Sequence, residues 1–323
     1  MLNVCILGGL GYIGSHLLEL LVPRQDIRIK VLDLELFGKD HVEHILQLSN
    51  VEYFRGNICN AADLSKVIRG SDVVIHLAGL VGDPACSIDK EITWLCNEQS
   101  SKIISSICNH YCVPFLIFVS TCSVYGASFS SDLLDEESKL NPVSLYAETK
   151  IISEDIFLSS FEGKCSILRF ATVFGLSKRM RFDLVANLFT IKAVKEGRFQ
   201  VFGGTQYRPF LHCHDAARSI LTLLGSDWSL VDREIFNVSC ENVAIRDLAI
   251  LVRESLPNTL VEFISKKEDR RNYCVSSKKV KEVLGFEPLI SLKEGIEEMG
   301  NKFLSSFNDW KSPKYYNHLV EIT

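Results

Sequence analysis

Residues 4–17 read VCILGGLGYIGSHL, an apolar run followed by Gly8, Gly11 and Gly14 and then by an apolar helical stripe. The run has the composition of a buried strand, and GSHLLELLV at 14–22 repeats apolar residues at helical intervals. The three glycines therefore fall in a turn between a strand and a helix. Such a turn lets the backbone approach a diphosphate closely, with the phosphate at the positive end of the helix. The stretch predicts a dinucleotide-binding βα unit.

The second predicted strand, RIKVLDL at 28–34, ends in Asp33, nineteen residues after Gly14. A carboxylate at this place can accept hydrogen bonds from both hydroxyls of a ribose. Glu35 follows and no arginine is adjacent, so a 2′-phosphate would be repelled. The sequence therefore predicts NAD rather than NADP. A solvated carboxylate at the end of a strand is the alternative interpretation of Asp33.

Further apolar, β-branched runs alternate with amphipathic stretches along the first half of the chain. The runs lie at 51–56, 72–78, 115–121 and 165–173, and the stretches at 61–68 and 97–111 fit crossover helices. Because the apolarity of these strands is continuous rather than alternating, they should be buried on both faces. The expected fold class is α/β, with a Rossmann-type doubly wound parallel sheet.

The pattern loosens after about residue 174, where glycine, charge and single aromatics are typical of loops and small helices. We expect an NAD-binding Rossmann domain over 1–168, to which 213–240 returns through the candidate strand EIFNVS at 234–239. A smaller, interleaved substrate-binding lobe is expected over 169–212 and 241–323. No linker-like stretch separates two independent domains.

Composition narrows the classes of function. The 323 residues are 47% hydrophobic and 23% charged, an ordinary globular mixture, with a formal net charge of −5. Nucleic acid or an anionic membrane is not expected as a partner, because either requires a basic surface. Eleven cysteines, several inside predicted strands, indicate reduced thiols and a cytoplasmic location. The first apolar segment is broken by four glycines, so we expect neither a signal peptide nor a spanning helix.

A reactive tyrosine is predicted in YAETK at 146–150, which leads into the helical IISEDIFLS. Tyr146 and Lys150 lie one helical turn apart, so they project from the same face. A free tyrosine has a pKa of about 10, and both a neighbouring ammonium and an oxidised nicotinamide favour the phenolate. Tyr146 is therefore a candidate general base toward a sugar or alcohol hydroxyl. The pattern alone is common on helix surfaces, and its combination with the glycine turn and Asp33 makes it informative.

These features occur in the order and spacing of a known family. Together with the glycine turn, HLAG at 76–79, STCSVYG at 120–126, LRFATVFG at 168–175, RPFLHCHD at 208–215 and LGFEP at 284–288 resemble the extended short-chain dehydrogenase/reductases. Within them the chain is most similar to the nucleotide-sugar epimerase/dehydratase branch. The resemblance covers nearly the whole chain and implies a tightly bound, recycled NAD. It leaves the reaction open among 4-epimerases, 4,6-dehydratases, decarboxylases and ketoreductases.

The resemblance also implies the roles of individual residues. Tyr146 would be the catalytic base, Lys150 would hold the nicotinamide ribose and lower the tyrosine pKa, and Thr121 would orient the reacting sugar hydroxyl. Asn57 stands where the family usually has an aspartate near adenine, and its amide oxygen can still meet the adenine amino group. The full set expected at the cofactor is Gly8, Gly11, Tyr12, Ile13, Gly14, Asp33, Asn57, Ile58, Leu77, Ala78, Gly79, Ser120, Tyr146 and Lys150.

For the nucleotide-diphosphate sugar, Asn187 and Arg208 match positions that bind the diphosphate in this family, and Arg271 is a third candidate. A guanidinium fork suits phosphate oxygens, although each arginine could instead form a surface salt bridge. Thr172 stands three residues after Arg169, where the family usually has an asparagine, so the local substrate contact departs from the pattern. HCH at 212–214 has no second ligand cluster nearby, and no metal is expected.

The two residues that follow Thr121 bear on the reaction. A 4,6-dehydratase needs an acid and a base there, and in that subfamily they are Asp and Glu, whereas here they are Cys122 and Ser123. A thiol and an alcohol make a poor acid/base pair without further activation. An epimerase needs no such pair, because the ketone intermediate turns over and receives the hydride on its other face. NAD-dependent epimerisation of a nucleotide-diphosphate sugar at C4 is therefore the leading hypothesis.

Two alternatives remain at this stage. A dehydratase or a 4-keto reductase could use Tyr146 and Lys150 with Cys122 as a proton relay. A non-catalytic NAD-binding regulator is a different class, and the intact Tyr146 and Lys150 argue against it, since a regulator needs no base aimed at the nicotinamide. The family analogy further suggests a homodimer formed through the helices near 97–111 and 146–160.

Overall fold

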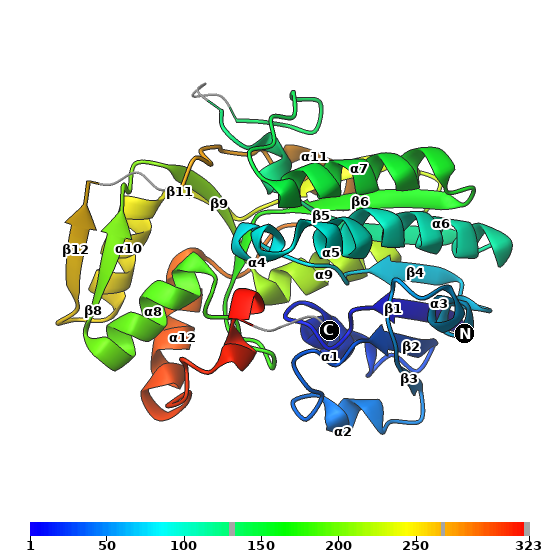
Figure 1. The fold of residues 1–323 in the computed structure, drawn as a ribbon, viewed down its shortest axis with the longest axis horizontal. Helices are drawn as coiled ribbons and strands as arrows, with labels where there is room; N and C mark the ends of the chain where they lie inside the picture. Colours follow the sequence, from blue (N-terminus) through cyan, green and yellow to red (C-terminus); the bar gives the residue numbers. More distant parts are fainter. Residues whose placement is uncertain (129–132, 266–268, 320–323) are drawn as a thin grey trace.

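The computed structural model describes residues 1–128, 133–265 and 269–319. A seven-stranded, all-parallel sheet occupies the centre of the molecule in the order β10-β6-β5-β4-β1-β2-β3 (Figure 1). Its strands are β1 (Leu2–Leu7), β2 (Ile27–Asp33), β3 (Val51–Arg55), β4 (Val73–His76), β5 (Phe115–Thr121), β6 (Lys164–Phe170) and β10 (Glu234–Val238). The strand order reverses between β1 and β4, which is where ligands bind in open sheets of this kind. The predicted Rossmann-type α/β class is confirmed.

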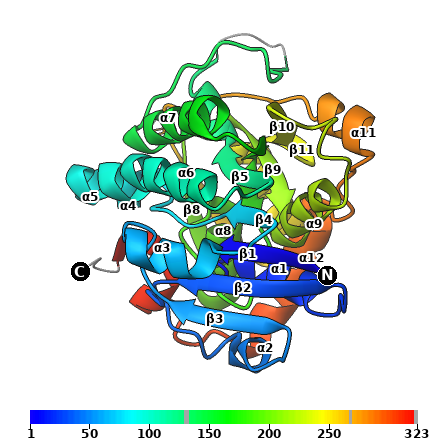
Figure 2. The same ribbon diagram turned by 90° about the vertical axis from the view of Figure 1, so that its right-hand side faces the viewer.

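Helices cover both faces of this sheet (Figure 2). One face packs against α1 (Gly14–Leu21) and α9 (Cys213–Leu224), and the other against α3 (Ala61–Ile68), α6 (Ser100–His110) and α7 (Leu145–Ser160). Alternate strand residues serve the two cores: Val4 and Ile6 face α1, while Cys5 and Leu7 face α3. Burial on both faces is the reason why the strands have continuous apolar sequences.

The apolar run at 165–173 forms two strands rather than one. β6 ends at Phe170, and β7 (Thr172–Phe174) pairs with β9 (Tyr207–His212), which in turn pairs with β11 (Glu241–Ala244) in a separate three-stranded sheet. The break falls at Ala171, whose N–H donates to the carbonyl of Val238 at 3.0 Å. Continuous apolarity cannot reveal such a break, because the apolar residues run on through both strands.

The remaining lobe is more regular than the loops and small helices that the sequence suggested. It contains α8 (Val185–Glu196), α10 (Ile245–Ser255), α12 (Leu292–Ser305) and a two-stranded parallel sheet of β8 (Arg198–Phe202) and β12 (Leu260–Ile264). Ser291 and Glu294 form a capping box at the start of α12. The lobe has its own core, in which Phe182, Phe189 and Phe303 pack. The chain also contains two short helices, α2 (Glu43–Leu46) between β2 and β3, and α11 (Lys278–Leu284) before α12.

A π-helical turn shapes the segment before α6. The chain passes through α4 (Asp83–Ile88), α5 (Lys90–Trp94) and the π-turn η1 (Leu95–Gln99), so α6 begins three residues later than the predicted helix at 97–111. Asn97 in this turn accepts from the N–H of Leu80 at 2.9 Å and donates to its carbonyl at 3.0 Å. The loop after β4 is thereby fixed. Among the described residues, none of the helices has the length and apolarity needed to cross a membrane.

Candidate active site

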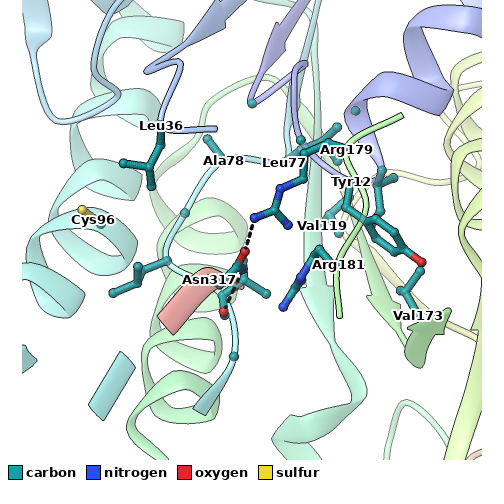
Figure 3. Close-up of a pocket in the computed structure, with 18 of the residues that line it drawn as sticks. Tyr12, Leu36, Leu77, Ala78, Cys96, Val119, Val173, Arg179, Arg181 and Asn317 are labelled. Carbon is teal, nitrogen blue, oxygen red and sulfur yellow. Dashed lines mark hydrogen bonds between the residues drawn. The ribbon is translucent and has the colours of Figure 1, made fainter. Parts of the chain in front are cut away.

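A cavity opens at the carboxyl ends of β1, β4 and β5, between the sheet and the lobe (Figure 3). Most residues predicted to bind a ligand line this cavity. They are Gly8, Gly11, Tyr12, Ile13, Gly14, Asp33, Asn57, Ile58, Leu77, Ala78, Gly79, Ser120, Thr121, Ser123, Tyr146, Lys150, Thr172 and Arg271. Cys122, Asn187 and Arg208 are not among the lining residues.

The glycine turn makes room that a side chain would fill. Gly8 has φ +88°, and a Cβ at this position would lie 2.7 Å from the backbone nitrogen of Ala78. A Cβ at Gly14 would lie 2.7 Å from the carbonyl oxygen of Gly9. The strand end and the helix start therefore pack backbone to backbone, which leaves the turn open to a diphosphate. This geometry fits a dinucleotide.

Asp33 is held in place at the end of β2. Its carboxylate accepts from the N–H of Leu10 and from the N–H of Glu35, both at 3.0 Å. Burial raises the pKa of Asp33 above its usual value, and the two backbone donors oppose that rise. The carboxylate is thus oriented by the glycine turn and lines the cavity, where a ribose can meet it. Asn57 follows the end of the neighbouring strand β3, and its side-chain oxygen accepts from the N–H of Cys59 at 2.9 Å.

Tyr146 and Lys150 enter the cavity from the first turns of α7, where the Ser144 hydroxyl caps the helix by accepting from the N–H of Ala147. Lys150 Nζ donates to the carbonyl of Val119 at 2.6 Å and lies 4.1 Å from the centre of the Phe118 ring. Burial lowers the pKa of Lys150 to about 7. Burial also raises the pKa of Tyr146, against smaller opposing effects of Arg181 and of a hydrogen bond with Thr121. The phenol is therefore protonated at neutral pH until a further positive charge arrives.

β5 leads directly into the 3₁₀ turn η2 (Cys122–Tyr125). As a result, the polar side chains that follow Val119 point in different directions. Thr121 Oγ1 accepts from the N–H of Ser123 at 3.1 Å and faces Tyr146. Ser123 Oγ lies 3.3 Å from the hydroxyl of Tyr273. Both Thr121 and Ser123 line the cavity.

Cys122 requires a correction. Its thiol is fully buried in a small core with Val124 and Tyr125, and it donates to the carbonyl of Arg169 at 3.1 Å. Burial raises the pKa of Cys122 well above its usual value. Because consecutive residues of the turn point in different directions, the thiol faces away from the cavity. A proton relay through Cys122 is therefore not supported by the geometry.

A buried ion pair lies behind the cavity wall. Arg169 on β6 and Glu154 on α7 are 2.7 Å apart, and neither side chain is more than 3% exposed. The hydroxyl of Ser120 donates to Glu154, and Arg169 donates to the hydroxyl of Tyr125 at 3.0 Å. Breaking a paired buried charge is costly, so this network holds β5, β6 and α7 in register beneath the site.

Asn187 also requires a correction. Its amide nitrogen donates to the hydroxyl of Tyr12 at 3.0 Å and to the carbonyl of Arg181 at 2.9 Å, while its oxygen accepts from the N–H of Gly175 at 3.0 Å. The side chain is fully buried, and both amide hydrogens are used. Asn187 therefore fixes the loop at 175–184 against the glycine turn instead of reaching a diphosphate.

Arg271 and Arg208, the two arginines predicted to bind the substrate, share one carboxylate in an ion-pair network. Arg271 lines the cavity and makes a bidentate contact with Asp269, with nitrogen–oxygen distances of 3.0 and 2.7 Å. Arg208 lies behind it, 3% exposed, and its Nη2 is 2.8 Å from the same carboxylate. Arg271 is also 3.1 Å from Asp83, which accepts from the Ser144 hydroxyl. Although burial alone would raise it, the two arginines hold the pKa of Asp269 well below its usual range.

The lining residues that the sequence reasoning missed include the polar side chains of Arg179, Arg181 and Asn317. Arg181 pairs with Asp183 through distances of 3.0 and 2.6 Å and lies near Tyr146. The basic cluster SKRMR at 177–181 was the available signal for the two arginines. No local pattern marks Asn317, because the folding of the chain end back onto the cavity brings it there.

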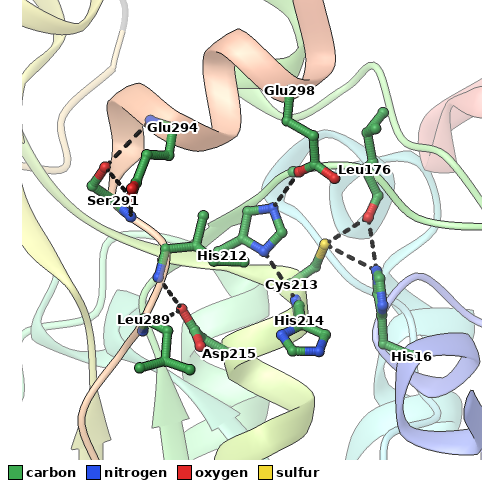
Figure 4. Close-up of polar contacts among 12 residues, drawn as sticks. His16, Leu176, His212, Cys213, His214, Asp215, Leu289, Ser291, Glu294 and Glu298 are labelled. Atoms are coloured by element: carbon green, nitrogen blue, oxygen red, sulfur yellow. Dashed lines mark hydrogen bonds and ion pairs between the residues drawn. The ribbon is translucent and has the colours of Figure 1, made fainter. Parts of the chain in front are cut away.

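The HCH segment makes polar contacts with α1 and α12 (Figure 4). His212 Nε2 lies 3.4 Å from Glu298 on α12, and Cys213 Sγ lies 3.2 Å from His16 Nε2 on α1. Cys213 also donates to the carbonyl of Leu176 at 3.0 Å. In the part of the chain that the structure describes, no group of three or more His, Cys, Asp or Glu side chains is arranged to hold a metal ion. The segment ties α1, α9 and the lobe together.

Comparison with known proteins gives matches along most of the chain. A family model described as the NAD dependent epimerase/dehydratase family matches residues 4–239. An uncharacterised UDP-glucose epimerase of Bacillus subtilis is 25% identical over 310 residues, covering 91% of this chain and 96% of that protein. The dTDP-D-glucose 4,6-dehydratase of Bos taurus is 26% identical over 332 residues, covering 96% and 91% respectively.

Solved structures agree with the fold. The crystal structure of UDP-glucuronic acid 4-epimerase from Bacillus cereus, in complex with UDP-glucuronic acid and NAD, superposes with a TM-score of 0.84. It is 25% identical in sequence, and the match covers 94% of this chain and 99% of that one.

Proposed function

The chain belongs to the NAD dependent epimerase/dehydratase family, and we propose that within it the protein is an epimerase that inverts C4 of a nucleotide-diphosphate sugar. Family membership confirms the resemblance that the motifs indicated. NAD is the cofactor, and the residues of the glycine turn together with Asp33, Lys150 and Tyr146 would hold it. The protein is accordingly an enzyme of NAD-dependent nucleotide-sugar chemistry.

One observation carries the choice of epimerase. Asp33, at the cofactor end, is the only carboxylate among the described residues that line the cavity. Dehydration needs an acid and a base beside Thr121, and the residues there are Ser123, an alcohol, and Cys122, a thiol turned into the core. Asp83 is near Tyr146, but its carboxylate is engaged by Ser144 and Arg271. Inversion at C4 needs none of these groups.

The residues of this chain can perform the proton half of that reaction. When bound, NAD supplies the hydride acceptor and donor for C4 and, in its oxidised form, a positive charge beside the phenol. With that charge and Lys150 nearby, Tyr146 takes the proton of the sugar hydroxyl and later returns it. Thr121, which hydrogen-bonds Tyr146, orients the same hydroxyl. The 4-keto sugar must then turn over, so its ring has to be held loosely.

The nucleotide end is proposed to lie against Arg271. A diphosphate would replace the carboxylates that Arg271 now contacts, since phosphate oxygens match the same fork. Arg208 supports this contact from behind through Asp269. The homologues with bound UDP-sugars are consistent with such a substrate. The proposed partner is a second copy of the chain, packed through α6 and α7, and the proposed location is the cytoplasm.

The test is incubation of the purified protein with UDP-, dTDP-, GDP- and CDP-hexoses in D₂O, followed by NMR. We expect C4 inversion of one sugar without deuterium at C4, because the same hydride leaves and returns. Loss of water from C6, with deuterium incorporated from the solvent, would contradict the proposal and indicate a dehydratase.

Tyr146→Phe is the matched catalytic variant for this assay. It removes only the phenolic oxygen and should lower turnover by about 10²- to 10⁴-fold while NAD remains bound. Undiminished turnover would exclude Tyr146 as the base. Size-exclusion chromatography with light scattering, applied to the same samples, tests the proposed homodimer.

A further inference from the structure

One of the cations that line the cavity forms no direct ion pair. Arg181 is paired with Asp183 and Arg271 with Asp269, but among the described residues no carboxylate forms an ion pair with Arg179. Arg179 is only 5% exposed, and its Nε has no hydrogen-bond partner. Burial lowers the pKa of Arg179 to about 9. A guanidinium withdrawn from water in this way is costly unless an anion approaches it.

The position of Arg179 indicates which anion this is. Its guanidinium carbon lies 3.6 Å from the centre of the Phe37 ring, and Phe37 follows the ribose-binding Asp33 by four residues. Besides its sequence neighbours Arg181 and Asp183, Tyr12 in the glycine turn and Asp33 act electrostatically on Arg179. The guanidinium therefore lies over the ends of β1 and β2, at the dinucleotide half of the cavity. Stacking on Phe37 fixes the plane of its hydrogen-bonding fork in advance.

Asn317 holds Arg179 in this position. Its side-chain oxygen accepts from Arg179 Nη2 at 2.7 Å, and its amide nitrogen donates to the carbonyl of Val81 at 3.2 Å (Figure 3). One side chain thus joins the loop at 175–184 to the loop after β4, from opposite walls of the cavity. Asn317 begins the 3₁₀ turn η4 (Asn317–Leu319), which follows η3 (Pro313–Tyr315).

The segment that carries Asn317 is anchored on the lobe. The N–H of Phe182 donates to the carbonyl of Tyr315 at 3.0 Å, and the centres of the two aromatic rings are 5.2 Å apart. Trp310, immediately upstream, is buried in the same aromatic core. The segment therefore lies between the lobe and the sheet, where Figure 1 draws it in red.

We propose that Arg179 is a ligand of the NAD diphosphate and that Asn317 clasps it there, so that residues 313–318 close over the bound cofactor and slow its release. The proposal shares only the cofactor with the proposed function. An enzyme that returns its NAD to the starting redox state in every turnover has no need to exchange it, and slow release keeps the reactive intermediate with its own cofactor.

Release of the cofactor can be measured directly. The protein is loaded with NADH and chased with excess NAD, and the loss of bound-NADH fluorescence gives the release rate without any sugar. Asn317→Ala removes a hydrogen bond to a charged group and should accelerate release about tenfold. Arg179→Ala should accelerate it further and lower the NAD retained after desalting. Arg179→Lys should restore retention only in part, because an ammonium lacks the fork.

Matched controls are available in the chain. Asn308→Ala removes a surface asparagine that accepts from Lys195 at 3.0 Å, and Arg246→Ala removes an exposed arginine stacked on Phe263 at 5.5 Å. Neither residue lines the cavity, and both variants should release NADH at the wild-type rate. The melting temperature of each cofactor-free variant shows whether it folds, and if Arg179→Ala does not, Arg179→Gln replaces it.

Wild-type release from either Asn317→Ala or the folded Arg179 variant would overturn the proposal. So would weaker binding of the nucleotide sugar with unchanged NADH release, because that result assigns Arg179 to the substrate. The sugar panel can fail while the release rates behave as expected, and the converse also holds. The two proposals are therefore tested separately.

Discussion

Burial acts in opposite directions on the pKa values of Tyr146 and Lys150, the proposed catalytic pair. It raises the pKa of Tyr146 and lowers the pKa of Lys150 to about 7, so each group favours its neutral form. Without a ligand, the site therefore favours a neutral phenol beside an amine that loses its proton more readily than an exposed lysine. Tyr146, the proposed base, would shift toward its phenolate only with a positive charge beside it, which NAD would supply when bound in its oxidised form.

The depressed pKa of Lys150 makes a prediction about stability. Between pH 7 and about 10.4 the unfolded chain binds a proton at Lys150 that the folded protein does not, so this residue makes stability rise with pH. Lys150→Met cannot titrate. In cofactor-stripped protein, the unfolding free energy of wild type minus that of Lys150→Met should rise from pH 7 to pH 9, by at most about 1.4 kcal/mol per pH unit. Urea unfolding measures it, and a flat difference would show that Lys150 keeps its ordinary pKa.

The cavity residues show what sequence can and cannot predict at this scale. Tyr146, Lys150 and Thr121 converge because a helix turn and a strand end have fixed geometry, and such local spacings are visible in the sequence. Cys122 is adjacent to Thr121 in sequence, yet its side chain points into the core, because a 3₁₀ turn directs successive side chains apart. Asn317 could not be found at all, because only tertiary folding carries it to Arg179.

The glycine turn gives a prediction for a single element. A Cβ at Gly14 would meet the carbonyl oxygens of Gly8 and Gly9, which are backbone atoms and cannot move without opening the turn. Gly14→Ala should therefore lose retained NAD and lower the melting temperature of the cofactor-free protein. Gly225→Ala is the control, because that glycine has helical dihedrals and its Cβ would make only ordinary contacts at 3.6 Å. Both properties are measured on desalted protein, and retention of NAD by Gly14→Ala would refute the close-packing argument.

Helices and strands were predictable where the spacing of apolar residues follows a single pattern along the segment. The central strands and α1 follow from apolar runs and a helical stripe, and the structure has them within one or two residues except for the run at 165–173, which divides at Ala171. The π-turn at η1 was not predictable, because an extra residue per turn leaves no mark on apolar spacing. The helices of the lobe were underestimated, since α8 and α12 pack on a mixed aromatic core instead of a regular sheet. The approach of segments distant in sequence, such as β7 and β9, depends on tertiary contacts.

At the scale of the whole molecule, the cavity is lined by residues of both the main sheet and the lobe. The chain leaves the main sheet at Ala171, builds part of the lobe, and comes back to the sheet through α9 and β10. Asn187 and the HCH segment connect the two cores directly beneath the glycine turn. A bound cofactor would contact both, so it should raise the stability of the sheet and the lobe together.

The chemical reactivity of the eleven cysteine thiols reports on this packing across the entire molecule. All are free, Cys112 is exposed, and six are buried: Cys5, Cys86, Cys108, Cys122, Cys165 and Cys213. Burial raises the pKa of Cys5 and of Cys165 to about 12, so they carry almost no thiolate at pH 8. In native protein, Ellman's reagent should modify Cys112 rapidly and the half-buried thiols more slowly, and the six buried thiols should react only after urea unfolding. Added NAD should slow the modification of Cys96, which lines the cavity, and leave that of Cys112 unchanged. Rapid reaction of all eleven thiols in native protein would mean that the cores open readily, and it would remove the basis for assigning Cys122 a purely structural place.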